Sequence, residues 1–466
     1  MEKIDFRVEE VEYSKKLSDC FCGEIVAVKD SRFLLAKIPE LSEKEKVFFA
    51  NALNELKLHN KMIVSKADIY FFLKEYCLER MILLTKEQRD KISTLLEWES
   101  IGESILTPLL TDPDFEEIVI NGPKKPIMVY HRVFGWLTTN VSFENEERIR
   151  TIINKMASPL GRQLSYHKPM LNAVLKDGSR LNASINPVAF SGINATIRKF
   201  KENPFTPSDL AELGTISFEA MAFLWLAMQS SCSILVCGNT GSGKTTTLNA
   251  LFCFLPKDER IVVVEETPEL LLPQNHTIKM NTAEQLNITM SGLIDNTFRM
   301  RPDRVVIGEI RTKEESNAFV NTMLAGQAKG SYATFHAESA QEAIQRFVSF
   351  GVMESTLKSI DLVLVQRRIN LIKNGNRIET RKVTQICEII ENNGKVTAKP
   401  IFEHDFEKKL LRKVTPSKRV KEKIKQAFQC KAEEVDKLIE TKEKLLRKLT
   451  NVAKFMEFYG LASNED

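Results

Sequence analysis

The spacing of hydrophobic and polar residues changes several times along the 466-residue chain. In the first part, apolar residues recur at intervals of three and four, the spacing that places them on one face of a helix. This pattern predicts helices over 43–56, 65–84 and 86–105. We therefore interpret residues 1–105 as a mainly helical N-terminal region, and no motif within it indicates a task.

Residues 106–203 have the pattern of a small α+β domain. Short apolar runs that are typical of strands lie at 118–120, 127–130, 135–138 and 195–200. Asp177-Gly178 stands between two further runs, 173–175 and 180–183, and this dipeptide favours a tight hairpin turn. The prolines at 204 and 207 mark the linker that ends the domain.

Residues 204–400 alternate between buried runs and helical patterns. The apolar runs lie at 233–237, 261–265, 304–308 and 331–335, and the helical patterns at 244–255, 285–300, 312–327 and 339–350. Such alternation predicts a doubly wound α/β domain with a mainly parallel sheet. A core helix from residue 218 is expected to lead into its first strand.

The C-terminal tail, residues 401–466, follows a predicted pair of strands at 381–387 and 394–398. From 417 to 458 the tail is charged and helical, with one apolar stripe. Its members are Val435, Leu438, Ile439, Leu445, Leu446, Leu449, Val452 and Met456. A stripe of this kind favours a face packed on the protein over a helix lying on a membrane.

Composition narrows the class of protein. Hydrophobic residues make up 43% and charged residues 27%, as in a globular protein, and the net charge of +4 gives no case for direct nucleic-acid binding. The eight cysteines include no C-x-x-C pair, and Cys20 and Cys22 have poor spacing for zinc, so we expect reduced thiols in the cytoplasm. No signal peptide or membrane-spanning run is visible, so any membrane association is expected through a partner.

The most informative motif is a phosphate-binding loop of the form G-x-x-x-x-G-K-T. It follows an apolar strand and precedes a helix, which is the context the motif requires. Lys244 is expected to reach the β- and γ-phosphates, and the Thr245 hydroxyl to ligate Mg²⁺. The candidate nucleotide-binding residues are Gly238, Asn239, Thr240, Gly241, Ser242, Gly243, Lys244, Thr245 and Thr246.

Two later strands end in carboxylates. The run 261–264 leads into Glu265 and Glu266, and the run 304–308 leads into Glu309. Because side chains alternate along a strand, only one of Glu265 and Glu266 is expected to face the phosphates, and the sequence leaves open which. Glu309 is predicted to orient the attacking water or hold the water shell of Mg²⁺.

A third strand, 331–335, delivers His336 to the same edge, where it is predicted to sense the γ-phosphate. Metal ligation by His336 is not expected, because no second ligand stands nearby at suitable spacing. Four arginines cluster around Glu309 in the sequence, and one or two are expected to reach a phosphate while others form structural ion pairs. They are Arg299, Arg301, Arg304 and Arg311.

Together these four elements resemble the secretion/traffic ATPase superfamily, which powers type II and type IV secretion, type IV pili and the archaellum. The resemblance runs from about residue 106 to 400: the Walker A loop, an Asp box at 265–269, a Walker B element at 300–311 and a His box at 330–336. The amino-acid sequence of residues 299–303 looks most like that of the archaeal branch. Glu265-Glu266 departs from the family's usual Glu-Asp, and the tetracysteine zinc module of many bacterial members is missing.

The resemblance implies a RecA-like ATPase domain, with ATP and Mg²⁺ bound between it and the preceding α+β domain. Arginines of that domain complete the site in the family, which makes Arg180, Arg198 and Arg162 candidates by position. It further implies a homohexamer on the cytoplasmic face of the membrane, attached through a polytopic platform protein. The expected function is a motor that assembles a pilus-like or archaellum filament or drives export.

Three alternatives accompany this interpretation. Within the superfamily, the chain could serve DNA transfer or protein secretion rather than filament assembly. A nucleotide-gated scaffold would bind ATP with negligible turnover. A small-molecule kinase on the same fold has no support, because no acceptor lid or lid-arginine pattern appears in the sequence.

Overall fold

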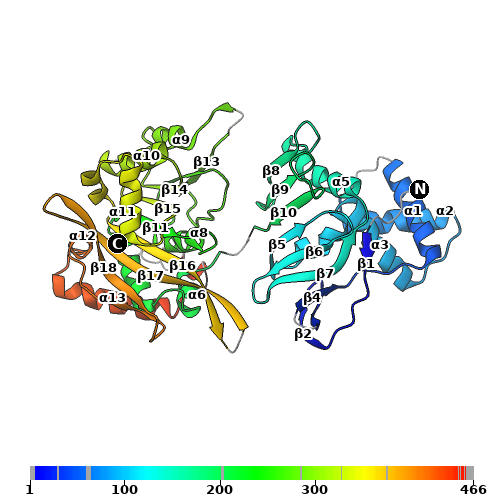
Figure 1. Cartoon of the computed structure of the whole chain (residues 1–466), viewed down its shortest axis with the longest axis horizontal. Helices are drawn as coiled ribbons and strands as arrows, with labels where there is room; N and C mark the ends of the chain where they lie inside the picture. The colour runs from blue at the N-terminus through cyan, green and yellow to red at the C-terminus, as the bar shows by residue number, and fades with distance from the viewer. Residues whose placement is uncertain are drawn as a thin grey trace. The chain divides into compact units, whose positions relative to one another are not determined.

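The computed structural model describes residues 6–28, 31–58, 64–200, 204–283, 286–326, 328–373, 376–449, 451, 453–455 and 457. The chain divides into two compact units, residues 1–201 and 202–466 (Figure 1). Each unit is built around a β-sheet of its own.

The sheet of the first unit has the strand order β2-β3-β4-β7-β6-β5-β10-β9-β8, with β1 paired to β7. Its strands are β1 (Phe6–Val8), β2 (Lys15–Cys20), β3 (Gly23–Val28), β4 (Ser31–Ala36), β5 (Phe115–Ile120), β6 (Pro126–His131), β7 (Gly135–Phe143), β8 (Met170–Val174), β9 (Arg180–Ser184) and β10 (Asn194–Arg198). The hairpin predicted around Asp177-Gly178 is confirmed as β8–β9, where Gly178 adopts the left-handed backbone that the turn requires (φ +86°).

The three helices predicted for the first unit are present, although the second and third end before residues 84 and 105, and two further helices were not predicted. The helices are α1 (Glu43–Leu58), α2 (Lys66–Glu79), α3 (Lys86–Ser100), α4 (Thr107–Thr111) and α5 (Glu146–Ala157), with 3₁₀ turns at Ser104–Leu106 and Ser158–Leu160. Capping boxes start α2 and α3, where the hydroxyls of Ser65 and Thr85 accept the N–H of Asp68 and Gln88. Leu53, Phe72 and Leu96 join the three long helices in a core of their own.

Strands β1–β4 differ from the expectation of a mainly helical N-terminal region. They occupy residues 6–36, and β4 pairs in parallel with β7, so the sheet extends across residue 105. The reason lies in β2, which forms the edge of the sheet and leaves most of its side chains exposed. Such a strand lacks the alternation of apolar and polar residues by which strands are recognised.

The second unit contains the parallel sheet that the sequence predicts. Its strand order is β13-β12-β14-β15-β11-β16-β17-β18-β19, and the first six are mutually parallel. The strands are β11 (Ile234–Gly238), β12 (Ile261–Glu265), β13 (Thr277–Asn281), β14 (Arg304–Ile310), β15 (Gly330–Phe335), β16 (Leu362–Lys373), β17 (Asn376–Asn392), β18 (Lys395–Asp405) and β19 (Leu410–Lys413).

Helices cover both faces of this sheet, which confirms the doubly wound α/β fold (Figure 1). The alternating residues Ile234 and Val236 of β11 pack with α7 and α8, whereas Leu235 and Cys237 pack with α9, α10 and α11. The helices are α6 (Pro207–Glu212), α7 (Phe218–Gln229), α8 (Lys244–Leu251), α9 (Met290–Thr297), α10 (Lys313–Leu324), α11 (Ala340–Ser349), α12 (Arg419–Phe428) and α13 (Ala432–Leu446), with 3₁₀ turns at Phe252–Phe254 and Glu354–Ser359.

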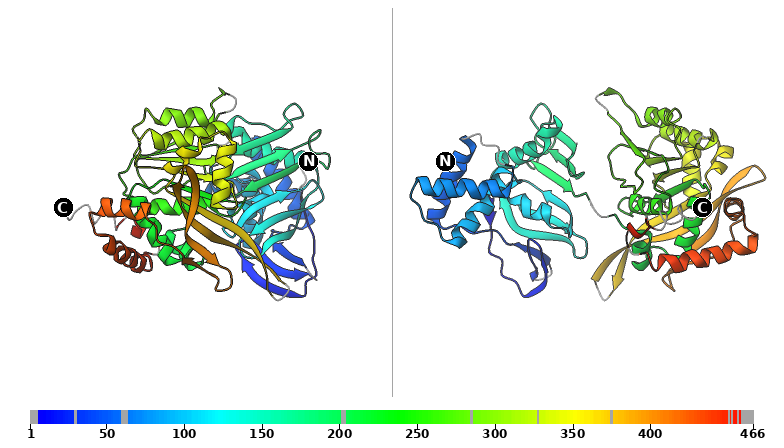
Figure 2. Two further views of the ribbon diagram at one scale, coloured as in Figure 1. Left: turned by 60° about the vertical axis from the view of Figure 1, so that its left-hand side comes forward. Right: turned by 180° about the vertical axis from the view of Figure 1, so that it is seen from behind.

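The C-terminal tail packs on this unit, as its apolar stripe predicts (Figure 2). Val435, Ile439, Leu446 and Leu449 are buried in the core that α7 helps to form. The predicted long helix is broken into α12 and α13 at Gln429, whose backbone is left-handed (φ +47°). Two predicted stripe members, Val452 and Met456, lie outside the described residues. Among the described residues, no helix combines the length and the apolarity needed to cross a membrane.

Arg304 is one of the arginines that form a structural ion pair, but it lies at the other end of β14 from Glu309. It is buried at the start of β14, whereas Glu309 lies near the end of that strand. Its guanidinium donates to both carboxylate oxygens of Glu259 (2.9 and 3.2 Å) and to the hydroxyl of Tyr332 (2.7 Å). Arg304 therefore fastens the amino edge of the sheet and does not surround Glu309.

We expect Arg304→Ala to destabilise the protein by about 3 kcal/mol, because it takes the bidentate guanidinium away from the largely buried Glu259 carboxylate and leaves it the half-exposed Lys329 ammonium at 3.6 Å. Urea unfolding of the whole chain, followed by circular dichroism, measures the change. Arg299→Ala is the control: this arginine is exposed, and its loss should change stability by about 0.5 kcal/mol at most. Equal effects of the two substitutions would contradict the structural role of Arg304.

Candidate nucleotide-binding site

The phosphate-binding loop, residues 238–243, joins β11 to α8 in the centre of the parallel sheet. Gly241 and Gly243 have positive φ angles of +72° and +91°, which favour glycine. A side chain at Gly238 would collide with the backbone carbonyl of Gln366 on the neighbouring strand. The glycines of the motif are therefore required by the path of the loop, as the sequence predicts.

The start of α8 has no side-chain cap, unlike the helices around it. Thr289, Thr312 and Ser339 cap the N-termini of α9, α10 and α11 with side-chain oxygens, but Gly243 gives α8 no such cap. The buried Ser242 hydroxyl also lacks a hydrogen-bond partner among the described residues. An uncapped helix start presents backbone N–H groups and the positive end of its dipole, so this position suits a phosphate.

Lys244, the first residue of α8, is 8% exposed and folds back over the loop. Its ammonium donates to the carbonyl oxygens of Gly238 (3.1 Å) and Asn239 (3.3 Å). Burial lowers the pKa of Lys244, and the nearby Glu309 carboxylate opposes that shift. Thr245 and Thr246 lie half-buried in the same first turn of the helix.

Glu309 and His336 meet at the carboxyl edge of the sheet, where β14 and β15 are neighbours. His336 Nε2 lies 2.5 Å from one Glu309 carboxylate oxygen, and Arg311 Nε donates to the other at 2.8 Å. Burial is the largest cause lowering the pKa of His336, with a further contribution from Lys244. The histidine is thus held mainly neutral near pH 7, in a form that donates one hydrogen bond and accepts another.

The structure separates the roles of Glu265 and Glu266, which the sequence leaves open. Glu265 is 2% exposed, and one of its oxygens accepts the backbone N–H groups of Glu269 (3.0 Å) and Leu270 (3.1 Å). Glu266 is exposed, and its carboxylate is paired with Arg311, which also binds Glu309. Glu266 therefore belongs to the Glu309 cluster, whereas Glu265 holds the loop that follows β12.

Gly308 makes room for this arrangement. A Cβ atom at position 308 would lie 2.9 Å from Cγ of Glu265, inside van der Waals contact. The Thr334 hydroxyl on β15 donates to the Gly308 carbonyl at 2.6 Å and fixes the strand beside it. The glycine before Glu309 thus serves the buried Glu265 side chain.

Gln366 contacts the phosphate-binding loop, and the sequence analysis did not predict a role for it. It is 1% exposed at the carboxyl end of the apolar run 362–365 in β16, next to β11. Its amide donates to the Ser242 carbonyl (2.8 Å) and accepts from the Thr247 hydroxyl (2.6 Å), so it ties the loop to the first turns of α8. The signal that could have found it is the one used elsewhere: a polar residue that ends a buried strand.

The three arginines carried over from the family lie in the first unit. Arg180 of β9 stands directly opposite Arg198 of β10 in the antiparallel ladder, and Arg198 also faces Glu117 of β5. Arg162 is exposed and donates to the backbone carbonyl of Asn172. A role in nucleotide binding remains a prediction for all three.

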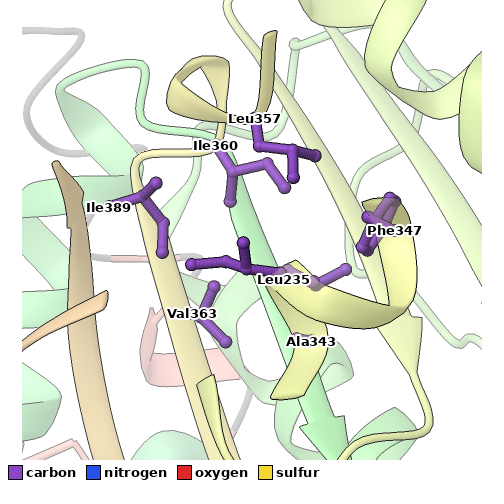
Figure 3. Close-up of a pocket in the computed structure, with 8 residues that line it drawn as sticks. Leu235, Ala343, Phe347, Leu357, Ile360, Val363 and Ile389 are labelled. Atoms are coloured by element: carbon purple, nitrogen blue, oxygen red, sulfur yellow. The ribbon is translucent and has the colours of Figure 1, made fainter. Parts of the chain in front are cut away.

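A small cavity elsewhere in the second unit is entirely apolar (Figure 3). Side chains of Leu235, Phe347, Leu357 and Ile389 lie around it, between α11 and the sheet. It offers no polar group to a ligand and represents a packing gap in the core.

A family model described as "Type II/IV secretion system protein" matches residues 99–455 of the chain. The chain belongs to this family. The membership confirms the superfamily that the four motifs predict, and the match begins just before the strands of the α+β region.

Two relatives and one solved structure illustrate this similarity. An uncharacterized protein of Methanocaldococcus jannaschii is 40% identical over 222 residues, which cover 45% of this chain and 31% of that protein. The chain thus spans about a third of that archaeal relative. The type IV secretion system protein VirB11 of Bartonella henselae is 30% identical over 327 residues, covering 60% of this chain and 90% of VirB11. The crystal structure of the pilus retraction motor PilT with bound ADP is 18% identical, covers 58% of this chain and 79% of PilT, and has a TM-score of 0.43.

Glu265 should make the stability of the second unit depend on pH. Burial raises the pKa of Glu265 to about 7, against 4.5 for an unperturbed glutamate. The folded state therefore binds the proton more tightly, and stability falls as pH rises from 4.5 to 7. Glu265→Gln keeps the oxygen that accepts both N–H groups, so it should remove about 2–3 kcal/mol of this pH dependence.

Urea unfolding of the two proteins at several pH values between 4.5 and 7.5 measures the difference. Glu266→Gln is the matched control, because this neighbouring carboxylate is exposed and should leave the pH dependence as in the wild type. Parallel curves for wild type and Glu265→Gln would refute a raised pKa at Glu265.

Proposed function

We propose that this protein is an Mg-ATP-hydrolysing motor of the type II/IV secretion family. One observation carries the proposal. The phosphate-binding loop and Lys244, at the uncapped start of α8, lie on the same edge of the sheet as the cluster of Glu309, His336 and Arg311. Lysine and N–H donors bind phosphate, whereas the carboxylate and imidazole handle a water molecule and its proton. Family membership supports the same reaction.

The triphosphate would be held by the N–H groups of 238–245, the Lys244 ammonium and the Ser242 hydroxyl, which fits an anion because it is buried and unpartnered among the described residues. Thr245 would ligate Mg²⁺, and Glu309 would hold it partly through water. The ion supplies positive charge that neutralises the phosphate oxygens during transfer.

In the hydrolytic step, water attacks the γ-phosphorus while the bond from that phosphorus to the β–γ bridging oxygen breaks, giving ADP and inorganic phosphate. The Glu309 carboxylate orients the water and accepts its proton. His336 holds Glu309 in place and responds to the γ-phosphate, and Arg311 with Glu266 fixes the other carboxylate oxygen. Glu265 acts as a positioning residue through the loop that it anchors.

The motor function follows by family resemblance. By its name, VirB11 is a type IV secretion system protein, and it is similar to this chain over 90% of its own length. We propose a homohexamer in which Arg180, Arg198 and Arg162 close on the nucleotide. It would work on the cytoplasmic face, bound to a polytopic membrane platform, and assemble a pilus-like or archaellum filament or drive export.

Lys244→Ala should abolish measurable binding of Mg-ATP, because it removes the buried ammonium that the loop positions. Glu309→Gln should still bind Mg-ATP but lower the hydrolysis rate by about 10²-fold or more, because the amide cannot accept the proton. Calorimetry measures binding, and phosphate release measures turnover. Glu314→Gln, an exposed carboxylate on α10, is the control and should match the wild type.

Wild-type turnover no faster than that of Glu309→Gln would favour the nucleotide-gated scaffold. Equal nucleotide binding by Lys244→Ala and the wild type would overturn the site itself. Comparison of Glu266→Gln with Glu265→Gln then assigns the second carboxylate: the first should slow turnover, and the second should mainly alter stability.

The assembly and its partner are tested separately. Light scattering of the purified chain with Mg-ATP should give the mass of a hexamer, and Arg180→Ala with Arg198→Ala should slow turnover without loss of folding, because both lie on a sheet surface. A tagged copy isolated from its own cells should bring with it one integral membrane protein. A monomer with full activity, or recovery without a membrane protein, would contradict this part of the proposal.

A further inference from the structure

Three potential metal ligands gather at the N-terminal hairpin of the first unit. Cys20 ends β2, Cys22 lies in the turn to β3, and Asp112 follows α4. The two sulfur atoms are 4.0 Å apart, and the two sulfurs and a carboxylate oxygen all lie within 4.8 Å of one another. The spacing of the cysteines alone is unfavourable for a metal site, but Asp112 supplies a third ligand from 90 residues away.

The backbone fixes these ligands in place. The N–H of Cys22 donates to Oδ2 of Asp112 at 3.0 Å, and its carbonyl accepts the N–H of Lys37 at 2.8 Å. The turn can continue only through glycine, since a side chain at Gly23 would collide with the carbonyl of Leu35. The N–H of Asp114 holds the other Asp112 oxygen at 3.0 Å. Each carboxylate oxygen keeps a second lone pair, so neither bond prevents coordination of a cation.

The charges near the cluster fit a divalent ion. Asp112 is fully buried, and the Lys199 ammonium donates to its backbone carbonyl. Two thiolates and one carboxylate carry three negative charges, which a divalent cation and Lys199 together balance. Without the ion, both cysteines are neutral thiols, and the negative charge of Asp112 is balanced by the positive charge of Lys199. Binding of the ion must therefore release two protons, one from each cysteine.

The distances fit a thiophilic ion of the zinc type. With Zn–S bonds of about 2.3 Å, tetrahedral coordination places two sulfurs roughly 3.8 Å apart, close to the separation found. The carboxylate oxygen lies within 4.8 Å of both sulfurs, and bonds of about 2.3 Å to sulfur and 2.1 Å to oxygen would place it roughly 3.6 Å from each, so it has to move by no more than about 1.2 Å. Cys22 is buried and Cys20 is half-buried, so Cys20 can adjust and solvent can supply a fourth ligand.

We propose that Cys20, Cys22 and Asp112 form a binding site for one zinc-like divalent cation, which staples the N-terminal hairpin to the segment that leads into β5. The hairpin strand β3 reaches the rest of the sheet through β4, whose Phe33 and Leu34 pair with Thr138 and Thr139 of β7. Coordination of the ion by both cysteines and Asp112 strengthens the link that the Cys22 N–H already makes from the turn to Asp112.

Cobalt(II) serves as the probe, added to the full-length, reduced and metal-free protein. We expect one Co²⁺ per chain, with an absorption band from thiolate-to-cobalt charge transfer and the visible intensity of a tetrahedral site, both removed by Zn²⁺. Zn²⁺ should also raise the midpoint temperature at which the first unit unfolds. Cys20→Ser should abolish the band, and this half-buried position tolerates the change. Asp112→Asn should weaken binding at least about tenfold.

Cys77→Ser is the matched control, because this half-buried cysteine of α2 lies in the same unit and outside the cluster, and it should leave the band unchanged. The proposal fails if the wild type binds no stoichiometric Co²⁺, if the band survives in Cys20→Ser, or if Asp112→Asn binds as tightly as wild type. It also fails if the two cysteines instead form a disulfide that excludes metal. Should Asp112→Asn unfold, Cys22→Ser must abolish the band for the site to stand. Nucleotide binding by the second unit is expected to be the same in all four variants.

Discussion

The parallel pairing of β12, β14, β15, β11 and β16 is the constraint on which the site depends. Parallel neighbours place their carboxyl ends along one edge, so whatever residue ends each buried run is delivered there. The runs end in Glu265, Glu309, Phe335 with His336 beyond it, Gly238 and Gln366. Five segments separated by up to 128 residues therefore supply the same edge of the sheet, although they are not neighbours in the sequence.

Charged groups at the two edges of this sheet have different environments. At the amino edge, the buried Arg304 guanidinium donates to both oxygens of Glu259 and to the hydroxyl of Tyr332. At the carboxyl edge, Glu309 is shared between His336 and Arg311, and the first turn of α8 has no cap. The first arrangement stabilises the fold, whereas the second leaves backbone donors available to an anion, as a nucleotide site requires.

The environment of a charged residue in this protein depends on where the fold places it and not only on its residue type. Glu265 and Glu266 are adjacent and identical, yet alternation turns one into the core, where burial raises its pKa to about 7, and the other toward Arg311. In the first unit, the chemistry available to Cys20 and Cys22 also depends on a contact that the sequence does not reveal. Their spacing argues against a metal, but the fold brings Asp112 to them and changes the chemistry available.

The amino-acid sequence determined six strands of the second sheet, the helices between its parallel strands and the loop at 238–245, because buried runs, helical spacing and glycine positions are local properties of the chain. It did not predict β13, β16 or β19. It also placed Glu309 and His336 at strand ends, and the family follows from these motifs. Only the tertiary structure decided that Arg304 lies at the far edge, that Glu266 joins Glu309, that Gln366 holds the loop and that β2–β4 join the first sheet. Each of these depends on contacts between distant segments or on an exposed edge strand, where the local pattern carries no signal of the partner.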